Sequence, residues 1–378
     1  ASAGLSRADL EDADGTVPVD LTLRSVADRT PSEPMDLGIR TDSLPALFVL
    51  ALLEDLEDVE GTISGQVDVA GTVDSPELLG TVRLVDGAWT VDAVGVRQSD
   101  VQATFDLQSD DRVLVSATGR AGGTVEVEGT VTLSPLRDPG LDLTIGLNEF
   151  RAVDRRDLLG VLSGEVQLTE RFRRPVITGA LSVDEGILYV EEFQRQVGIV
   201  DLSDPRFLTF MDRAAFEGRP LLAQTRNPFM DSLRVNVDLE VARNTWLRSD
   251  DMNVEIRGEM IVTYDRPNQD FVLIGELQAP RGQYQFLSRT FEVRSGSVQF
   301  VGTPGINPNL DIVASARVRR REGVPLDIIA NLTGTLVEPR IELSSEEGGI
   351  SESDLISYIA IGRPSNELTG FFQGGGGG

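Results

Sequence analysis

Hydrophobic and polar residues alternate one by one along much of this chain. Residues 124–133 read Thr-Val-Glu-Val-Glu-Gly-Thr-Val-Thr-Leu, with valines at every second position and mainly charged or hydroxyl side chains between them. The alternation returns at 232–241, 253–264, 310–318 and 326–332. Because successive side chains of a strand point to opposite faces, the pattern predicts antiparallel strands with one dry and one wet face.

The apolar positions of these stretches are the candidate dry face of the predicted sheet. They share a place on the valine side of the alternation and a β-branched or aliphatic side chain. They are Val125, Val127, Val131, Leu233, Val235, Val237, Leu239, Val241, Val254, Ile256, Met260, Val262, Leu310, Ile312, Leu326, Ile328 and Leu332.

Glycine and proline break the alternation about every ten residues, which is the spacing of a meander of short strands. Two of the breaks share one template, at 71–78 and 334–341, and a looser copy runs from 169 to 177. The chain therefore predicts one repeated strand–turn–strand unit. About two dozen strands at ~4.8 Å each would make a sheet on the order of 110 Å long.

Four short helices are expected among the strands. The first is 43–57, with an apolar stripe and Ser43 as N-cap, and the second is 155–162. A third begins at 204 and runs toward 216. The fourth follows Ser351, which is a typical N-cap, and ends near 362. The fold class expected is all-β: an elongated, repetitive antiparallel sheet with a few short helices.

The alternation is lost between 201 and 230, where several prolines occur. We therefore expect β repeats with short helices over 1–200, a helical or loop insertion over 201–230, and a second sheet region over 231–365. The last segment, 366–378, is rich in glycine and is predicted to be a disordered tail. Both ends look cut, so the chain is interpreted as a fragment of a longer protein.

Composition narrows the possible functions. The 378 residues carry a formal net charge of −27, and arginine provides all 34 basic side chains. Nucleic-acid binding is not expected, since phosphates would be repelled over most of the surface. The chain has no histidine and no cysteine, which removes the commonest general base, the commonest metal ligand and any disulfide.

Candidate catalytic and metal-binding groups are few. Asp110-Asp111 and Asp250-Asp251 offer paired carboxylates, but both pairs fall where turns are expected, and aspartate favours turns. No histidine is available to activate a serine. We therefore predict that the chain is not an enzyme, with no catalytic residue, no metal site and no cofactor.

Four arginines, Arg317, Arg319, Arg320 and Arg321, form a basic cluster in an acidic sequence. One interpretation is contact with anionic lipid headgroups or with an acidic partner. The other is protection of a strand edge and turn against pairing with other strands. The sequence favours the second interpretation, because edge strands are commonly protected by charge.

The C-terminal third carries the most specific motifs. Phe291-Glu-Val-Arg-Ser-Gly-Ser-Val-Gln-Phe300 is followed by Asn307-Pro-Asn-Leu-Asp-Ile-Val-Ala314, by Gly334-Thr335 with Pro339, and by Asp354-Leu-Ile-Ser-Tyr-Ile359. In this order they resemble the C-terminal domain of the TamB family, the translocation and assembly module proteins. The resemblance covers 230–365 well. The repeats upstream are similar to the looser TamB and AsmA-like repeats.

This resemblance implies a β-sheet curled into a groove with an apolar concave side. It further implies a location in the periplasm and envelope of a diderm bacterium, an inner-membrane anchor at the N-terminus, and pairing with a TamA-like outer-membrane barrel of the Omp85 class. The implied cargo is phospholipid. We expect the anchor to lie outside the sequence given.

Alternation alone leaves open what covers the dry face. It could pack against a second sheet, close on itself, or be filled by acyl chains. With the resemblance, the leading expectation is a scaffold that carries phospholipid between membranes, with the seventeen apolar positions lining its groove. The alternative is a chaperone-like partner of an Omp85 barrel that pairs its sheet edge with nascent outer-membrane proteins. A third is an acidic filament stabilised by calcium.

Overall fold

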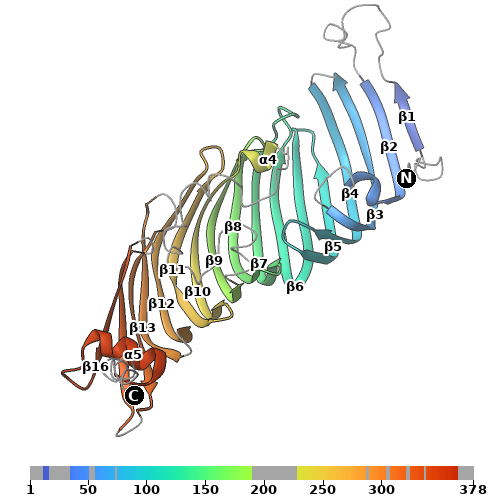
Figure 1. Ribbon diagram of the computed structural model, residues 1–378. Helices are drawn as coiled ribbons and strands as arrows, with labels where there is room; N and C mark the ends of the chain where they lie inside the picture. The colour runs from blue at the N-terminus through green and yellow to red at the C-terminus, as the bar shows by residue number, and fades with distance from the viewer. Residues whose placement is uncertain are drawn as a thin grey trace, which may run out of the picture.

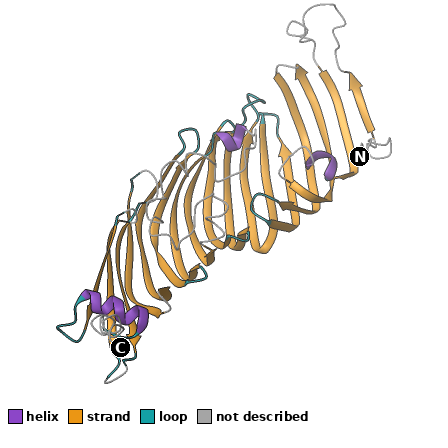
Figure 2. Cartoon of the chain, in the orientation of Figure 1, coloured by secondary structure: helices purple, strands orange, loops and turns teal. Residues whose placement is uncertain are grey.

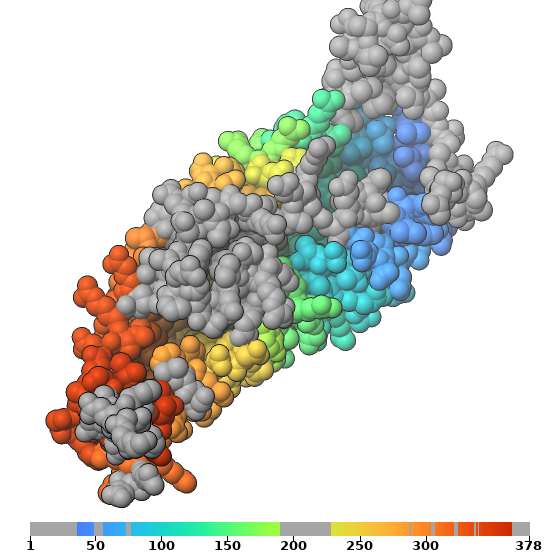
Figure 3. Space-filling view, in the orientation of Figure 1, coloured from blue at the N-terminus to red at the C-terminus, as the bar shows by residue number. Residues whose placement is uncertain are grey.

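One long sheet makes up almost all of the protein. The computed structural model describes residues 12–16, 35–50, 56–72, 75–189, 228–286, 289–303, 307–320, 324–335 and 338–364. They form a sixteen-stranded sheet whose strands lie side by side in sequence order. In Figures 1 and 3 the colours run from blue to red along the long axis, so position in the chain corresponds to position along the molecule. The elongated all-β fold predicted from the alternation is confirmed.

The strands are long, and three short helices accompany them in the described ranges. The first nine strands are β1 Asp12–Thr16, β2 Met35–Pro45, β3 Leu56–Thr72, β4 Ser75–Val91, β5 Val96–Leu107, β6 Arg112–Thr132, β7 Gly140–Asp154, β8 Leu158–Arg171 and β9 Arg174–Tyr189. The other seven are β10 Arg234–Arg248, β11 Met252–Asp265, β12 Asp270–Phe286, β13 Arg289–Val301, β14 Asn309–Val318, β15 Leu326–Thr335 and β16 Pro339–Ser345. The helices are α1 Leu47–Leu50, α4 Pro228–Asp231 and α5 Glu352–Ile361.

Neighbouring strands are antiparallel with one exception. β10 runs parallel to β9, with Val237 opposite Gly179. A parallel neighbour needs a crossover connection, and the chain between these strands, 190–227, lies outside the described residues. Most of the insertion predicted at 201–230 falls there, and its last residues begin α4. The sheet itself continues directly from the first predicted region into the second.

The 21-residue stretch β6 turns back on itself. Extended, it would span about 70 Å. The residues that flank it are nevertheless hydrogen-bonded, since the amide of Leu133 donates to the carbonyl of Asp111 at 2.7 Å. Gly122, with φ of 78°, lies near its middle, where pairing with β5 gives way to pairing with β7. Beyond the bend of β6 at Gly122, the end of β7 meets the turn that leads into β5, where the amide of Asp154 donates to the carbonyl of Val94 at 2.9 Å.

A single apolar face crosses the sheet. Directly paired residues of neighbouring strands share a face, so the register can be followed from strand to strand. One such row, from β6 to β12, is Val127, Ile145, Val166, Gly179, Val237, Val262 and Leu273. Figures 1 and 2 show the strands bent so that the sheet curls along its length, and α5 lies over this face at the C-terminal end.

Glycines on the apolar face lie within strands and not at their ends. Gly164 of β8, Gly179 of β9, Gly258 of β11 and Gly275 of β12 have φ values of 130°, 145°, 154° and 145°. A Cβ atom on any of them would collide with a backbone carbonyl of the paired strand. The described residues form sixteen strands and not about two dozen, because glycines such as Gly164 and Gly179 were taken as strand ends.

The local helix predictions had mixed outcomes. The helix expected at 43–57 is confirmed only in part: α1 lies within it, but its first residues end β2 and its last two begin β3, and 51–55 lie outside the described residues. The helix expected at 155–162 is also wrong, because a turn there leads into β8. The helix after Ser351 is confirmed, with Ser351 as N-cap and Gly362 as C-cap. The stretch 204–216 lies outside the described residues.

Candidate functional site

All seventeen predicted apolar positions lie on the face described above. Pairing places them there directly, for example Leu239 opposite Met260 and Ile312 opposite Leu332. Six are buried, and the others are partly exposed. The buried ones are Leu233, Val237, Val241, Val254, Leu326 and Ile328.

The same face contains residues that the alternation analysis did not include. Leu273 and Leu277 of β12 lie opposite Val262 and Gly258. Val298 of β13 connects Leu277 to Leu310. In β7, the residues that connect the inner face of β6 to that of β8 are Leu141, Leu143, Ile145 and Leu147. Its every-second-residue pattern was present in the sequence and could have been recognised.

Elements of the chain cover this face near both ends of the described sheet. At the N-terminal side Ala46, just before α1, is fully buried against Leu84, Val101 and Ala103 of β4 and β5. At the C-terminal side α5 packs on β13, β14 and β15. The buried cluster there is Phe291, Ala316, Val318, Leu326, Ile328, Leu355 and Ile359.

Between these ends the apolar face forms the inside of the curl. Side chains such as Leu147, Leu239 and Met260 remain partly exposed in the middle of long strands, although Val237 and Val241 beside them are buried. No second sheet lies over them within the described ranges. We call this inner apolar face, from β7 to β12, the trough.

The arginine cluster is largely engaged within the chain. Arg317 donates two hydrogen bonds to the Asp327 carboxylate, at 2.8 and 2.9 Å, and these bonds lower the pKa of Asp327. Arg320 pairs with Glu347 and lies over the ring of Tyr358 at 5.7 Å. Arg319 is exposed, and Arg321 lies outside the described residues. These pairs lie at the end of β14, a strand that is paired on both sides, so protection of an edge and contact with headgroups or an acidic partner both stay predictions.

A buried carboxylate on the opposite, outer face was not predicted. Glu255 of β11 is 5% exposed and pairs with Arg281 of β12, which lies over the ring of Trp246 at 5.3 Å. The amide of Asn244 also donates to it, at 3.3 Å. The hydrogen bond from Arg281 is the main reason why the pKa of Glu255 is lowered. This arrangement depends on pairing between strands, so no local sequence signal indicates it.

The acidic pairs lie in turns, as expected. Asp110 is bound by Arg112 at 2.6 Å in the turn before β6, and Asp250 and Asp251 lie between β10 and β11. In the described part of the chain no three acidic, histidine or cysteine side chains gather where a metal ion could bind. None of the described helices is long and apolar enough to cross a membrane.

Comparison with known families gives a match over most of the sequence. The family model described as the TamB C-terminal domain matches residues 110–378, from β6 through α5 to the end of the chain. Proteins of this family serve envelope assembly in the translocation and assembly module, together with an outer-membrane partner. Since the match covers well over half of the sequence, the chain belongs to the TamB family.

Proposed function

We propose that the trough is a non-enzymatic conduit that holds the acyl chains of phospholipid and lets them pass between the inner and outer membranes. The observation that carries this proposal is the unbroken register of apolar residues from strand to strand, on a face with no described second layer at its middle. An apolar surface of this extent favours contact with other apolar groups.

The free energy of apolar contact suits an acyl chain that slides along the trough. Each CH₂ group transferred from water into the trough contributes about 0.8 kcal/mol. Because side chains of similar chemistry recur at every strand, a chain that leaves one set of contacts meets an equivalent set on the next strand. The polar outer face and the net charge of −27 keep the outside of the curl hydrated.

Charge placed in the middle of the trough should block it. Val237 is 6% exposed on the inner face of β10, and its neighbour Asn236 is exposed on the outer face. We expect Val237→Arg to reduce phospholipid binding and transfer severalfold, because an unpaired guanidinium among apolar groups is costly and repels acyl chains. Asn236→Arg adds the same charge outside the trough and should leave binding unchanged.

The measurement is native mass spectrometry of lipid bound to the purified chain, followed by transfer of labelled phospholipid between vesicles. Circular dichroism shows whether each variant keeps its strand content. A folded Val237→Arg variant that binds and transfers lipid as well as Asn236→Arg would contradict the conduit. So would a wild-type chain that never carries phospholipid.

A second function is favoured by the edge of β16. This strand pairs with β15 on one side, and no described strand pairs with its other side. Ile341 on it is 60% exposed. An open edge of this kind can add a strand from another protein, such as a TamA-like barrel of the Omp85 class or a nascent outer-membrane protein. Crosslinking from β16 to such a protein, without bound lipid, would support this function over the conduit.

A further inference from the structure

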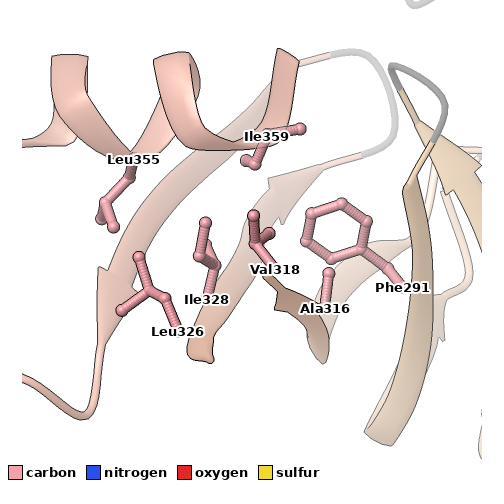
Figure 4. Close-up of a cluster of buried hydrophobic side chains, with 7 residues drawn as sticks. All are labelled: Phe291, Ala316, Val318, Leu326, Ile328, Leu355 and Ile359. Carbon is pink, nitrogen blue, oxygen red and sulfur yellow. The ribbon is translucent and has the colours of Figure 1, made fainter. Parts of the chain in front are cut away.

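The helix α5 occupies the inner face of the sheet beyond the trough. Leu355 and Ile359 of α5 point onto Leu326, Ile328 and Val318 (Figure 4). All five side chains are at most 1% exposed. On the inner face of β10 and β11, Leu239 and Met260 are partly exposed, whereas Val237, Val241 and Val254 are buried. The helix therefore seals the apolar face that continues the trough toward β16.

The contacts of α5 match those that an acyl chain would make. Its inward side chains are aliphatic, and the surface beneath them is the same register of inner-face residues that forms the trough, since Ile312 of β14 lies opposite Leu332 and Ala316 opposite Ile328. Apolar burial is not directional, so helix side chains and acyl chains can compete for one surface.

One polar group weakens the packing of α5 on the sheet. Ser357 of α5 is 8% exposed, and its hydroxyl has no hydrogen-bond partner among the described residues. A buried hydroxyl without a partner loses its hydration and gains nothing in return. An apolar residue at this position would therefore make the packing of α5 on the sheet more stable.

The connection to α5 permits movement. Gly348 and Gly349 link β16 to the helix, and a Cβ atom on either would meet no other atom within 4 Å. At the other end of α5, Arg289 donates to the carbonyl of Ile359 at 3.0 Å. A two-glycine link in open space on one side and a hydrogen bond at the other can act as hinge and latch.

The outward side of α5 carries exposed apolar residues in its later turns, after the polar Glu352 and Ser353. Ile356 and Ile361 are 49% and 48% exposed. A helix that is apolar on both sides is normally covered on both sides. Leu355 and Ile359 thus face the sheet, and Ile356 faces away from it.

We propose that α5 is a displaceable occupant of the C-terminal part of the trough, which acyl chains replace when lipid passes this end. This inference rests on the conduit function proposed above. In the closed state α5 protects the apolar face from water, and in the open state the face under it becomes the last binding site for lipid.

The absence of cysteine makes a direct test possible. In the full chain, Leu326→Cys with Leu355→Cys is oxidised to tie α5 to β15, and bond formation is verified by mass. Vesicles containing dansyl-labelled phosphatidylethanolamine supply the lipid. We expect transfer to acceptor vesicles to fall severalfold in the oxidised form and to recover on reduction to the level of the same double variant before oxidation.

A second pair of variants tests the opposite direction without a disulfide. Ile359→Ser loosens the inward side of α5, and Ile356→Ser makes the same change on its outward side. We expect faster transfer and faster hydrogen exchange in α5 for Ile359→Ser only. If α5 were solely a structural cap, Ile359→Ser would lower the melting temperature without faster transfer, and that result would overturn the proposal.

The outcomes separate this inference from the function beneath it. Equal transfer by the oxidised and reduced forms, with wild-type transfer intact, rejects the displaceable helix and leaves the conduit standing. Wild-type chain that neither binds nor transfers the labelled lipid rejects the conduit itself.

Discussion

At the scale of single residues, glycines on the inner face set how closely the strands approach. Gly258 and Gly275 lie on neighbouring strands with φ values of 154° and 145°, which side chains with a Cβ rarely adopt. A Cβ atom on Gly258 would meet the carbonyl oxygen of Glu276, the residue after Gly275. A Cβ atom on Gly275 would meet the carbonyl oxygen of Glu259, the residue after Gly258. The pair lets two strands bend together, and the arrangement recurs at Gly164 and Gly179.

Adding one methyl group at this point should be costly. We expect Gly258→Ala to destabilise the protein by about 1–3 kcal/mol, because it forces strained φ and a collision with the Glu276 carbonyl. The measurement is the midpoint of urea unfolding.

Gly146 is a matched control in β7. A Cβ atom there meets nothing within 4 Å. We expect Gly146→Ala to be neutral or to stabilise by about 0.4–1 kcal/mol, because alanine restricts the unfolded chain. Equal losses of stability at the two positions would show that the inner-face glycines are not conformationally required.

The buried pair on the outer face makes stability depend on pH. The hydrogen bond from Arg281 lowers the pKa of Glu255 in the folded protein, so its contribution is complete above the unfolded pKa and is lost as pH falls through the folded pKa. We therefore expect Glu255→Gln to be less stable than wild type at neutral pH. The difference should begin to shrink below the ordinary glutamate pKa of about 4.3, where the unfolded carboxylate takes up its proton, and should be lost as pH falls through the lower folded pKa.

Urea unfolding at neutral and acidic pH measures this effect. Glu126→Gln, at an exposed position of β6, serves as the control and should show little difference at either pH. A Glu255→Gln deficit that stays constant with pH would mean that packing, and not ionisation, is responsible.

At the scale of elements, α5 is the helix whose boundaries are defined by local contacts. The Ser351 hydroxyl accepts from the amide of Asp354 at 3.3 Å, and Gly362 ends the helix in the left-handed conformation. These signals lie within a few residues of one another, which is why the sequence predicted this helix. The cap also fixes the direction in which Leu355 and Ile359 face the sheet.

Removing the cap should loosen α5 without unfolding the sheet. We expect Ser351→Ala to destabilise the helix by about 1 kcal/mol, since the amide of Asp354 in its first turn loses the side-chain oxygen of Ser351 as an acceptor. Amide hydrogen exchange should quicken in 352–361 and stay unchanged in β10 and β11. Faster exchange throughout the sheet would instead show that α5 is needed for the stability of the whole molecule.

The helix predicted at 43–57 shows the limit of such local reasoning. Its apolar stripe was compatible with a helix, but β2 pairs with β3 through Leu44 and Ile63. Strand pairing with a partner some twenty residues away outweighs weak helix preference. At 155–162 the turn is fixed by Arg155, whose guanidinium donates twice to the Asp157 carboxylate at 2.9 Å. Neither partnership is apparent from periodicity.

At the scale of the whole molecule, the sheet is close to one-dimensional. Each strand pairs only with its sequence neighbours, so the molecule lengthens by about 4.8 Å with each strand added. Length and continuity of the apolar face therefore follow from repetition. A globular core of the same composition would instead bury that face against itself.

The alternation determined the strand class and the identity of the inner residues, and the capping residues determined the end helix, because these features depend on residues only a few positions apart. The tertiary structure decided that β9 and β10 run parallel, that Glu255 is buried beside Arg281, and that α5 lies on the face it covers. It also decided that the glycines lie inside strands and not at their ends. These features arise from contacts between distant residues, which a linear pattern of polarity does not encode.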